Sequence, residues 1–161
     1  MKTYYLTLSK VFPATHRRAG EQTNFEAAFH SGQVSHLGSE RIYRYPKLHT
    51  IRANYEFWEK RFEKIGKGEA CLSIRQWTGK PYRSRQLEIA RLTREDGIGL
   101  QRMIVIGCTT IHPIYIDGHS VKVSTLAHND GLDETDWRNW FEGYDLTEPL
   151  AVIQFTNFRY K

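Results

Sequence analysis

The sequence predicts a single α+β domain built on a small, mainly antiparallel β-barrel with flanking helices. The 161 residues, 40% of them hydrophobic, suffice for one core, so one domain is expected over residues 1–161. Short segments of alternating apolar and polar residues indicate about seven strands that mostly follow one another along the chain. About three other stretches have helical periodicity. Sequential short strands with few helices are typical of a small antiparallel barrel.

The N-terminal part begins with a strand and continues through a helix and an irregular segment. Residues 3–9 alternate aromatic and polar side chains, which predicts a strand. The Thr-x-x-Glu pattern near the start of residues 23–30 is typical of a helix capping box and predicts a short helix. Residues 33–46 have no clean periodicity and are interpreted as an irregular insertion. Residues 48–52 are expected to be extended.

The middle of the chain contains the clearest local patterns. Residues 54–65 carry aromatic and aliphatic side chains at helical spacing and are followed by two glycines, which predicts a helix. Residues 69–76 and 85–92 alternate as strands do, and the Thr-Gly-Lys-Pro turn at residues 78–81 lies between them. This combination predicts a β-hairpin.

The C-terminal part is predicted to complete the sheet and to add one helix. Residues 103–108 form a strongly apolar strand, and residues 120–124 a short one. Residues 132–141 have aromatic side chains on related faces of a helix. Residues 150–158 are expected to form the closing strand.

The charge of the chain is positive and unevenly distributed. The net charge is +5 and the pI is near 9.2. Residues 75–94 contain six basic residues and one acidic residue, whereas residues 126–148 contain seven acidic residues and one basic residue. The basic segment suits a phosphate backbone, and the acidic segment would be repelled by one.

The predicted hairpin combines cationic and aromatic side chains around its turn. Cations hold phosphates and aromatic rings stack on unpaired bases, so this mixture suits single-stranded nucleic acid. The alternative is an exposed hairpin that is kept soluble by its charge. The candidate nucleic-acid-binding residues are Arg75, Lys80, Tyr82, Arg83 and Arg85, with Trp77 close by.

The most informative motif is Lys-x-x-Thr-x-Arg at residues 47–52. In an extended segment Thr50 and Arg52 share one face, and Lys47 follows a proline from which its long side chain can reach that face. An amine and a hydroxyl within reach of one point are the minimum for a lysine-activated oxygen nucleophile, or for an anion clamp. Alternatively, these residues only solvate the entrance to a strand.

Asp130 directly precedes the predicted C-terminal helix, and two roles are open to it. Its carboxylate can stabilise the positive end of the helix dipole. It can instead be the carboxylate that orients the Lys47 amine. The distance between the two residues along the chain does not decide between these two roles.

Several classes of protein are not expected. No apolar run approaches the roughly 20 residues that span a bilayer, and the N-terminus lacks the apolar core of a signal peptide. Only Cys71 and Cys108 are present, which favours reduced thiols in a cytoplasmic protein. No cofactor loop is found. The spacing of the candidate ligands does not predict a metal site; these candidates are His112, Asp117, His119 and His128.

Taken together, the motif at residues 47–52, the Gly-Glu-Ala at residues 68–70 and the Ala-His-Asn-Asp-Gly at residues 127–131 resemble the ASCH domain family. An acidic, Trp-rich helix and the strand at residues 150–158 follow in the same order. This family is a branch of the PUA-like superfamily. The resemblance implies a PUA-like β-barrel with flanking helices and a cleft beside the barrel that recognises RNA or a modified nucleoside, with Arg52 at the family arginine.

One branch of the family comprises N4-acetylcytidine amidohydrolases, and the resemblance implies roles for three residues. Thr50 would attack the amide carbonyl, Lys47 would accept its proton, and Asp130, which replaces the family glutamate, would hold the lysine. The family often has glycine where this chain has Tyr45. Recognition of RNA or a nucleoside is therefore the first hypothesis, and an amidohydrolase acting on an N4-acylated cytidine is the alternative. The oligomeric state stays open.

Overall fold

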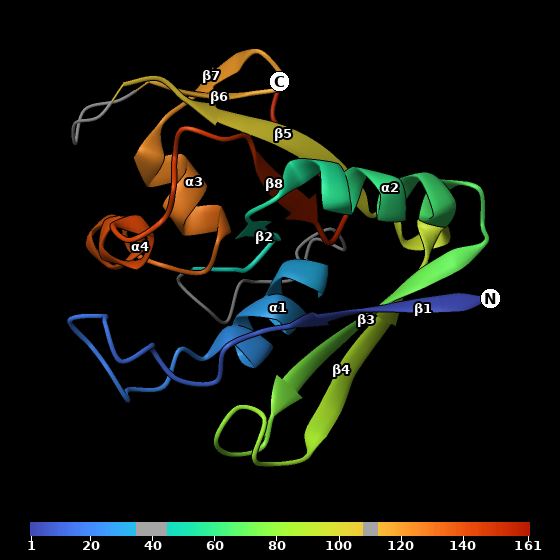
Figure 1. The fold of residues 1–161 in the computed structure, drawn as a ribbon, viewed down its shortest axis with the longest axis horizontal. Coiled ribbons are helices and arrows are strands. Elements are labelled where there is room, and N and C mark those ends of the chain that lie inside the picture. Colours follow the sequence, from blue (N-terminus) through green and yellow to red (C-terminus); the bar gives the residue numbers. More distant parts are fainter. Residues whose placement is uncertain (35–44, 108–112) are drawn as a thin grey trace.

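The computed structural model describes residues 1–34, 45–107 and 113–161, and the predicted α+β class is confirmed. Two sheets lie at different ends of the molecule, and helices lie beside and between them (Figure 1). Most of the predicted insertion at residues 33–46 lies outside the described residues, as do Cys108 and His112.

The smaller sheet has three strands in the order β1-β3-β4. The predicted hairpin is present as β3 and β4, which are antiparallel. β1 pairs with β3 in parallel, which requires a long connection between them, and the chain makes it through α1, β2 and α2. The strands are β1 (Lys2–Thr7), β3 (Ala70–Trp77) and β4 (Gln86–Leu92).

The larger sheet has five strands in the order β2-β8-β5-β6-β7, and all its pairings are antiparallel. Every residue of β8 is buried, so its apolar sequence reflects a strand with neighbours on both sides. The strands are β2 (His49–Arg52), β5 (Gly99–Val105), β6 (Ile114–Ile116), β7 (His119–Val121) and β8 (Leu150–Gln154).

The strands of the described residues form two separate sheets and not the closed barrel that was expected. β1 and β4 are the edges of the small sheet, and β2 and β7 are the edges of the large one. The barrel prediction relied on sequential pairing, whereas β1 pairs with β3 and β2 with β8. One hydrophobic core nevertheless includes residues from both sheets, among them Leu72 of β3 and Val152 of β8.

Four α-helices are found in the described residues: α1 (Phe25–Val34), α2 (Tyr55–Gly66), α3 (Val123–Asn129) and α4 (Glu134–Phe141). The predictions of α1, α2 and α4 are confirmed within a few residues. The prediction of a strand over residues 120–124 is wrong in part, because β7 ends at Val121 and α3 begins at Val123. The β-branched residues favour a strand locally, but a helix buries Leu126 and Ala127 in the core. Among the described residues, no helix is long and apolar enough to span a membrane.

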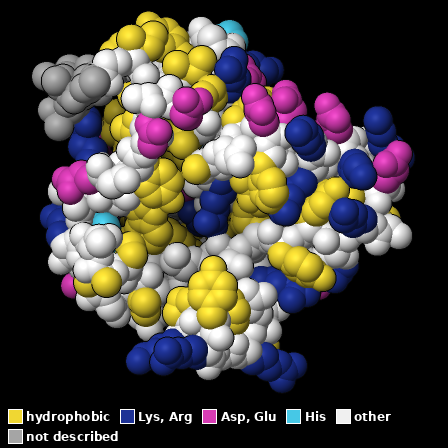
Figure 2. Space-filling model, viewed as in Figure 1, with side chains coloured by type: hydrophobic (Ala, Val, Ile, Leu, Met, Phe, Trp, Pro, Cys, Tyr) yellow, Lys and Arg dark blue, Asp and Glu magenta, His cyan; other side chains and the backbone are white. Residues whose placement is uncertain are grey.

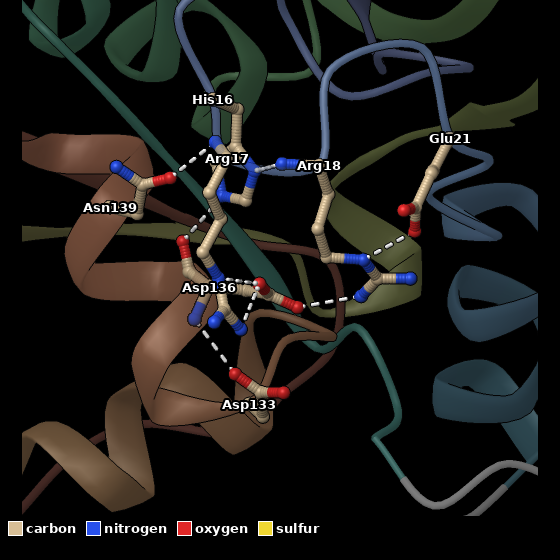
Figure 3. A network of polar contacts seen from close by, with 7 residues as sticks. All are labelled: His16, Arg17, Arg18, Glu21, Asp133, Asp136 and Asn139. Atoms are coloured by element: carbon tan, nitrogen blue, oxygen red, sulfur yellow. Dashed lines mark hydrogen bonds and ion pairs between the residues drawn. The ribbon is translucent and has the colours of Figure 1, made fainter.

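An ion-pair cluster fastens the polar loop that follows β1 to α4 (Figure 3). The buried Asp136 carboxylate accepts hydrogen bonds from Arg17 at 2.8 Å and from Arg18 at 2.7 Å, and His16 Nε2 lies 3.0 Å from the Asp136 carbonyl oxygen. Burial opposes ionisation, but the hydrogen bonds from the two arginines hold the pKa of Asp136 below its ordinary value. The cluster therefore fixes the helix that carries Trp137, a side chain of the site described below.

Candidate functional site

Lys47 and Asp130 form a buried ion pair. Lys47 Nζ donates hydrogen bonds to the Asp130 side chain and to its backbone carbonyl, both at 2.8 Å. The side chains are 2% and 5% exposed. The fold thus brings together two candidate residues that are 83 positions apart in sequence.

Other side chains complete the surroundings of this pair. Trp137 Nε1 donates to the second carboxylate oxygen of Asp130 at 3.1 Å. Lys47 Nζ lies 4.0 Å from the centre of the Phe25 ring, a cation–π distance. Contacts from α1 and α4 therefore fix both charged groups in one orientation, which is what a site needs for positioning a ligand.

The backbone of Lys47 is held between α1 and α3. Its N–H donates to the Ala28 carbonyl at 2.9 Å, and the next N–H, that of Leu48, donates to Asn129 at 2.7 Å. Gly32 of α1 makes this approach possible, since a Cβ atom built there would lie 2.8 Å from the Lys47 carbonyl oxygen. A glycine thus lies against the backbone of the site lysine.

We expect Gly32→Ala to lower the free energy of unfolding by about 1–3 kcal/mol, because the new methyl group must push the Lys47 backbone away. Urea unfolding measures this. Gly66→Ala is the matched control, because a Cβ at this α2 residue meets no atom within 4 Å, and stability should be unchanged or raised by up to about 1 kcal/mol. Equal effects of the two substitutions would contradict the close approach of α1 to Lys47.

A third charge lies beside the pair. Arg52 Nη2 donates to the Thr7 carbonyl at 2.5 Å, and its buried Nε has no hydrogen-bond partner in the described part of the chain. Burial lowers the pKa of Lys47 and of Arg52 and raises that of Asp130, although the Lys47–Asp130 attraction opposes both shifts within the pair. With all three groups ionised, the cluster carries one net positive charge and favours an electron-rich ligand.

The three charged residues open onto a small pocket. Its volume is about 30 Å³, room for about two water molecules or for one edge of a larger ligand. The hollow is visible near the centre of Figure 2, with basic side chains deep inside it. Hydrophobic side chains form much of its wall. The residues that line it include Phe25, Lys47, Thr50, Arg52, Asp130, Trp140, Phe141 and Tyr144.

His49 is a buried neighbour of the pair that the motif analysis did not assign to the site. Its Nε2 lies 2.7 Å from the Tyr160 hydroxyl, and its Nδ1 lies 3.7 Å from Asp130 Oδ1. Burial, and then the nearby Lys47 charge, hold the pKa of His49 well below its ordinary value, so the ring is neutral. No local sequence signal indicated the contact of His49 with Tyr160 near the end of the chain.

The candidate residues of the hairpin lie together, apart from the pocket floor. Arg75 is on β3, Arg85 immediately precedes β4, and the other candidates lie in the turn between the strands. The half of β3 nearer the turn is connected to the pocket, because Thr7 of β1 pairs with Arg75 and the Thr7 carbonyl accepts the hydrogen bond from Arg52. In Figure 2 basic side chains gather over the lower end of the molecule, where Figure 1 places the hairpin.

Within the part of the chain that the structure describes, no three His, Cys, Asp or Glu side chains gather as metal ligands would. Cys71 is a buried free thiol. Comparison with known proteins finds no family model, no curated protein and no solved structure that matches this chain. The site therefore has to be interpreted from its own geometry.

Proposed function

We propose that the chain recognises a base of RNA or of a nucleoside at the Lys47 pocket, as the resemblance to ASCH domains implies. The observation that carries this proposal is the composition of the pocket, which combines basic donors, a carboxylate and the Thr50 hydroxyl with aromatic walls. A nucleobase presents hydrogen-bonding edges and a flat face, and proteins recognise it with polar groups and aromatic rings. At about 30 Å³ the pocket takes one edge of the base, and the remainder lies on the rim.

The proposal includes the PUA-like fold class. The five-stranded antiparallel sheet, the contact between Lys47 and Asp130, and the close approach of Gly32 to Lys47 support it.

The basic hairpin is the second part of the proposed RNA surface. An RNA backbone bound along the hairpin would extend toward the pocket, because the contact between Arg52 and Thr7 connects the hairpin sheet with the pocket. Electrostatic binding of this kind releases counterions and weakens as salt increases.

Neutralising the hairpin tests this part of the proposal. The triple variant Lys80→Gln/Arg83→Gln/Arg85→Gln is expected to bind single-stranded RNA at least about tenfold more weakly. The slope of log affinity against log salt should fall by about 2 if three phosphate contacts are lost. Fluorescence anisotropy over a salt series measures both quantities.

The matched control removes the same charge from exposed positions of α2 and the residue that follows it, with Lys60→Gln/Lys64→Gln/Lys67→Gln. This control should reduce affinity much less. If both triple variants weaken binding equally, only the net charge matters and the hairpin is not the binding surface. Absence of any RNA binding at low salt would contradict the polymer part of the proposal.

A second candidate function is favoured by the 2.8 Å contact between Lys47 and Asp130, which supplies the carboxylate that a lysine base needs. In this proposal the Thr50 oxygen attacks the acetyl carbonyl of N4-acetylcytidine and its proton moves to neutral Lys47. The C–N bond breaks, the proton passes to the departing N4 amine, and water then releases acetate from Thr50. Burial lowers the pKa of Lys47, which favours the neutral amine.

The resting geometry requires one movement for this chemistry. Both hydrogen bonds found for Lys47 Nζ go to Asp130, so the amine has to turn toward the Thr50 hydroxyl when substrate binds. Incubation of the purified chain with N4-acetylcytidine, followed by absorbance, tests the activity, and cytidine and acetate are the expected products.

A further inference from the structure

We propose that the outer face of the small sheet is a stacking platform for single-stranded nucleic acid. The platform is called here the aromatic strip and consists of Tyr5, Arg75, Trp77 and Tyr82. This inference rests on the proposed function and deepens it, because it selects an unpaired polymer, and not a free nucleoside or a duplex, as the ligand.

The strip lies on the face of the sheet that points away from the core. Side chains alternate along β1, where Tyr4 and Leu6 are buried and Tyr5, between them, is 53% exposed. Tyr5 pairs with Ser73 in register, so the side chains of Arg75 and Trp77, two and four residues further along β3, share its face. The buried Leu72 and Ile74 occupy the opposite face.

Each ring of the strip lies close to a cation or to another ring. The Arg75 guanidinium lies 4.2 Å from the centre of the Tyr5 ring, and the Trp77 and Tyr82 rings lie 5.2 Å apart. Tyr82 is 90% exposed, and its φ of 63° is in the left-handed region that non-glycine residues rarely adopt. A large exposed ring on a strained backbone is costly for stability alone, and such strain is concentrated at binding sites.

The length of the strip favours a polymer. Tyr5 pairs with Ser73, which is four residues before Trp77 on β3. At about 3.3 Å per residue, this part of the strip is about 13 Å long. Successive bases of a helical strand are about 3.4 Å apart, so one nucleoside covers only part of this distance. Aromatic side chains stack on bases only where these are unpaired, which favours a single strand over a duplex.

The charges around the strip complement a phosphate backbone. Lys10 Nζ donates to the Thr78 carbonyl at 3.3 Å and thus lies at the hairpin turn. Lys80, Arg83 and Arg85 are exposed in the same turn. The acidic residue on this face, Glu88, is neutralised by Arg91 at 2.9 Å and accepts a further hydrogen bond from Ser73.

Removing the rings without unfolding the sheet tests the inference. Tyr82→Gly removes the ring and relieves the positive φ, so thermal stability should not fall. Tyr5→Ala removes an exposed side chain from the edge strand β1. Each substitution is expected to weaken binding of a single-stranded RNA of about ten nucleotides by about 5- to 150-fold, the range for loss of one stacked base.

Phe57→Ala is the matched control, because Phe57 is a 44% exposed aromatic residue on α2, outside the strip. Its affinity for the RNA should equal that of the wild type. A duplex of the same sequence should bind the wild type more weakly than the single strand, and Tyr82→Gly should not change duplex binding. Binding of cytidine, measured by calorimetry on each variant, should be unchanged because the pocket is intact.

The outcomes separate the strip from the pocket. Loss of RNA binding in the strip variants with cytidine binding retained supports the strip. If the strip variants bind the single strand as tightly as the wild type does, or if the wild type prefers the duplex, the proposal for the strip is overturned. Binding of cytidine would in that case still support the proposal for the pocket. If the wild type binds neither RNA nor cytidine, both proposals are overturned.

Discussion

Replacing Asp130 with alanine is expected to lower the free energy of unfolding by about 3–5 kcal/mol. The substitution leaves the Lys47 ammonium buried without its carboxylate, and the Trp137 N–H loses its acceptor. Burial already opposes the charge of Lys47, as the lowered pKa of this residue indicates. Urea denaturation monitored by circular dichroism measures the change.

A double-mutant cycle shows whether the effect comes from the pair. Lys47→Met should also destabilise the chain, whereas Lys47→Met/Asp130→Ala should cost clearly less than the sum of the single substitutions, because no unpaired charge remains. Glu134→Ala is the comparison at the surface, where Glu134 pairs with Arg138 at 2.8 Å and little change is expected. A loss at Asp130 no larger than that at Glu134 would show that the buried pair contributes little.

The same pair shows what could be predicted from sequence and what could not. Lys47, Thr50 and Arg52 lie within six residues, so strand alternation placed Thr50 and Arg52 on one face, and both line the pocket. The sequence allowed Asp130 to be proposed as the partner of Lys47, but it did not show that the two side chains meet. Their contact depends on how β2, α1 and α3 pack together. The link between His49 and Tyr160 is a contact over 111 residues and had no local signal.

Local patterns predicted the fold where neighbouring residues alone determine structure. The β3–β4 hairpin follows from strand alternation and a turn, and α2 follows from helical spacing and the glycines after it. The β1–β3 pairing did not follow, because parallel neighbours are joined by a long connection and local patterns do not indicate which distant strands pair. α3 was missed because its β-branched residues favour a strand until burial of Leu126 is considered.

Both proposed sites depend on the segment that connects them. Arg52 of the pocket donates to the Thr7 carbonyl, and Thr7 pairs with Arg75, which lies between Tyr5 and Trp77 in the aromatic strip. A strand bound along the strip would reach the pocket with one base, and the pocket's small volume would then select the edge of that base. A nucleoside can use the pocket alone, so its binding reports on the pocket without the strip.

If the chain is an amidohydrolase, Thr50→Val is expected to reduce turnover of N4-acetylcytidine by at least about 10⁴-fold, since loss of a nucleophile removes the covalent step. Valine keeps the volume and β-branching of threonine, so β2 should pair with β8 as before. Thr50→Ser keeps the hydroxyl and should retain a substantial part of the activity. Thr3→Val, on β1 of the other sheet, should leave turnover unchanged.

The pH dependence gives an independent measure of the proposed base. Lys47 accepts a proton only when it is neutral, so the rate should rise with pH until Lys47 is deprotonated. Burial lowers the pKa of Lys47, so the rise should end below the pH at which an exposed lysine titrates. Turnover by Thr50→Val with the same pH profile as the wild type would mean that Lys47 activates another nucleophile, and Thr50 would then be a residue that binds substrate.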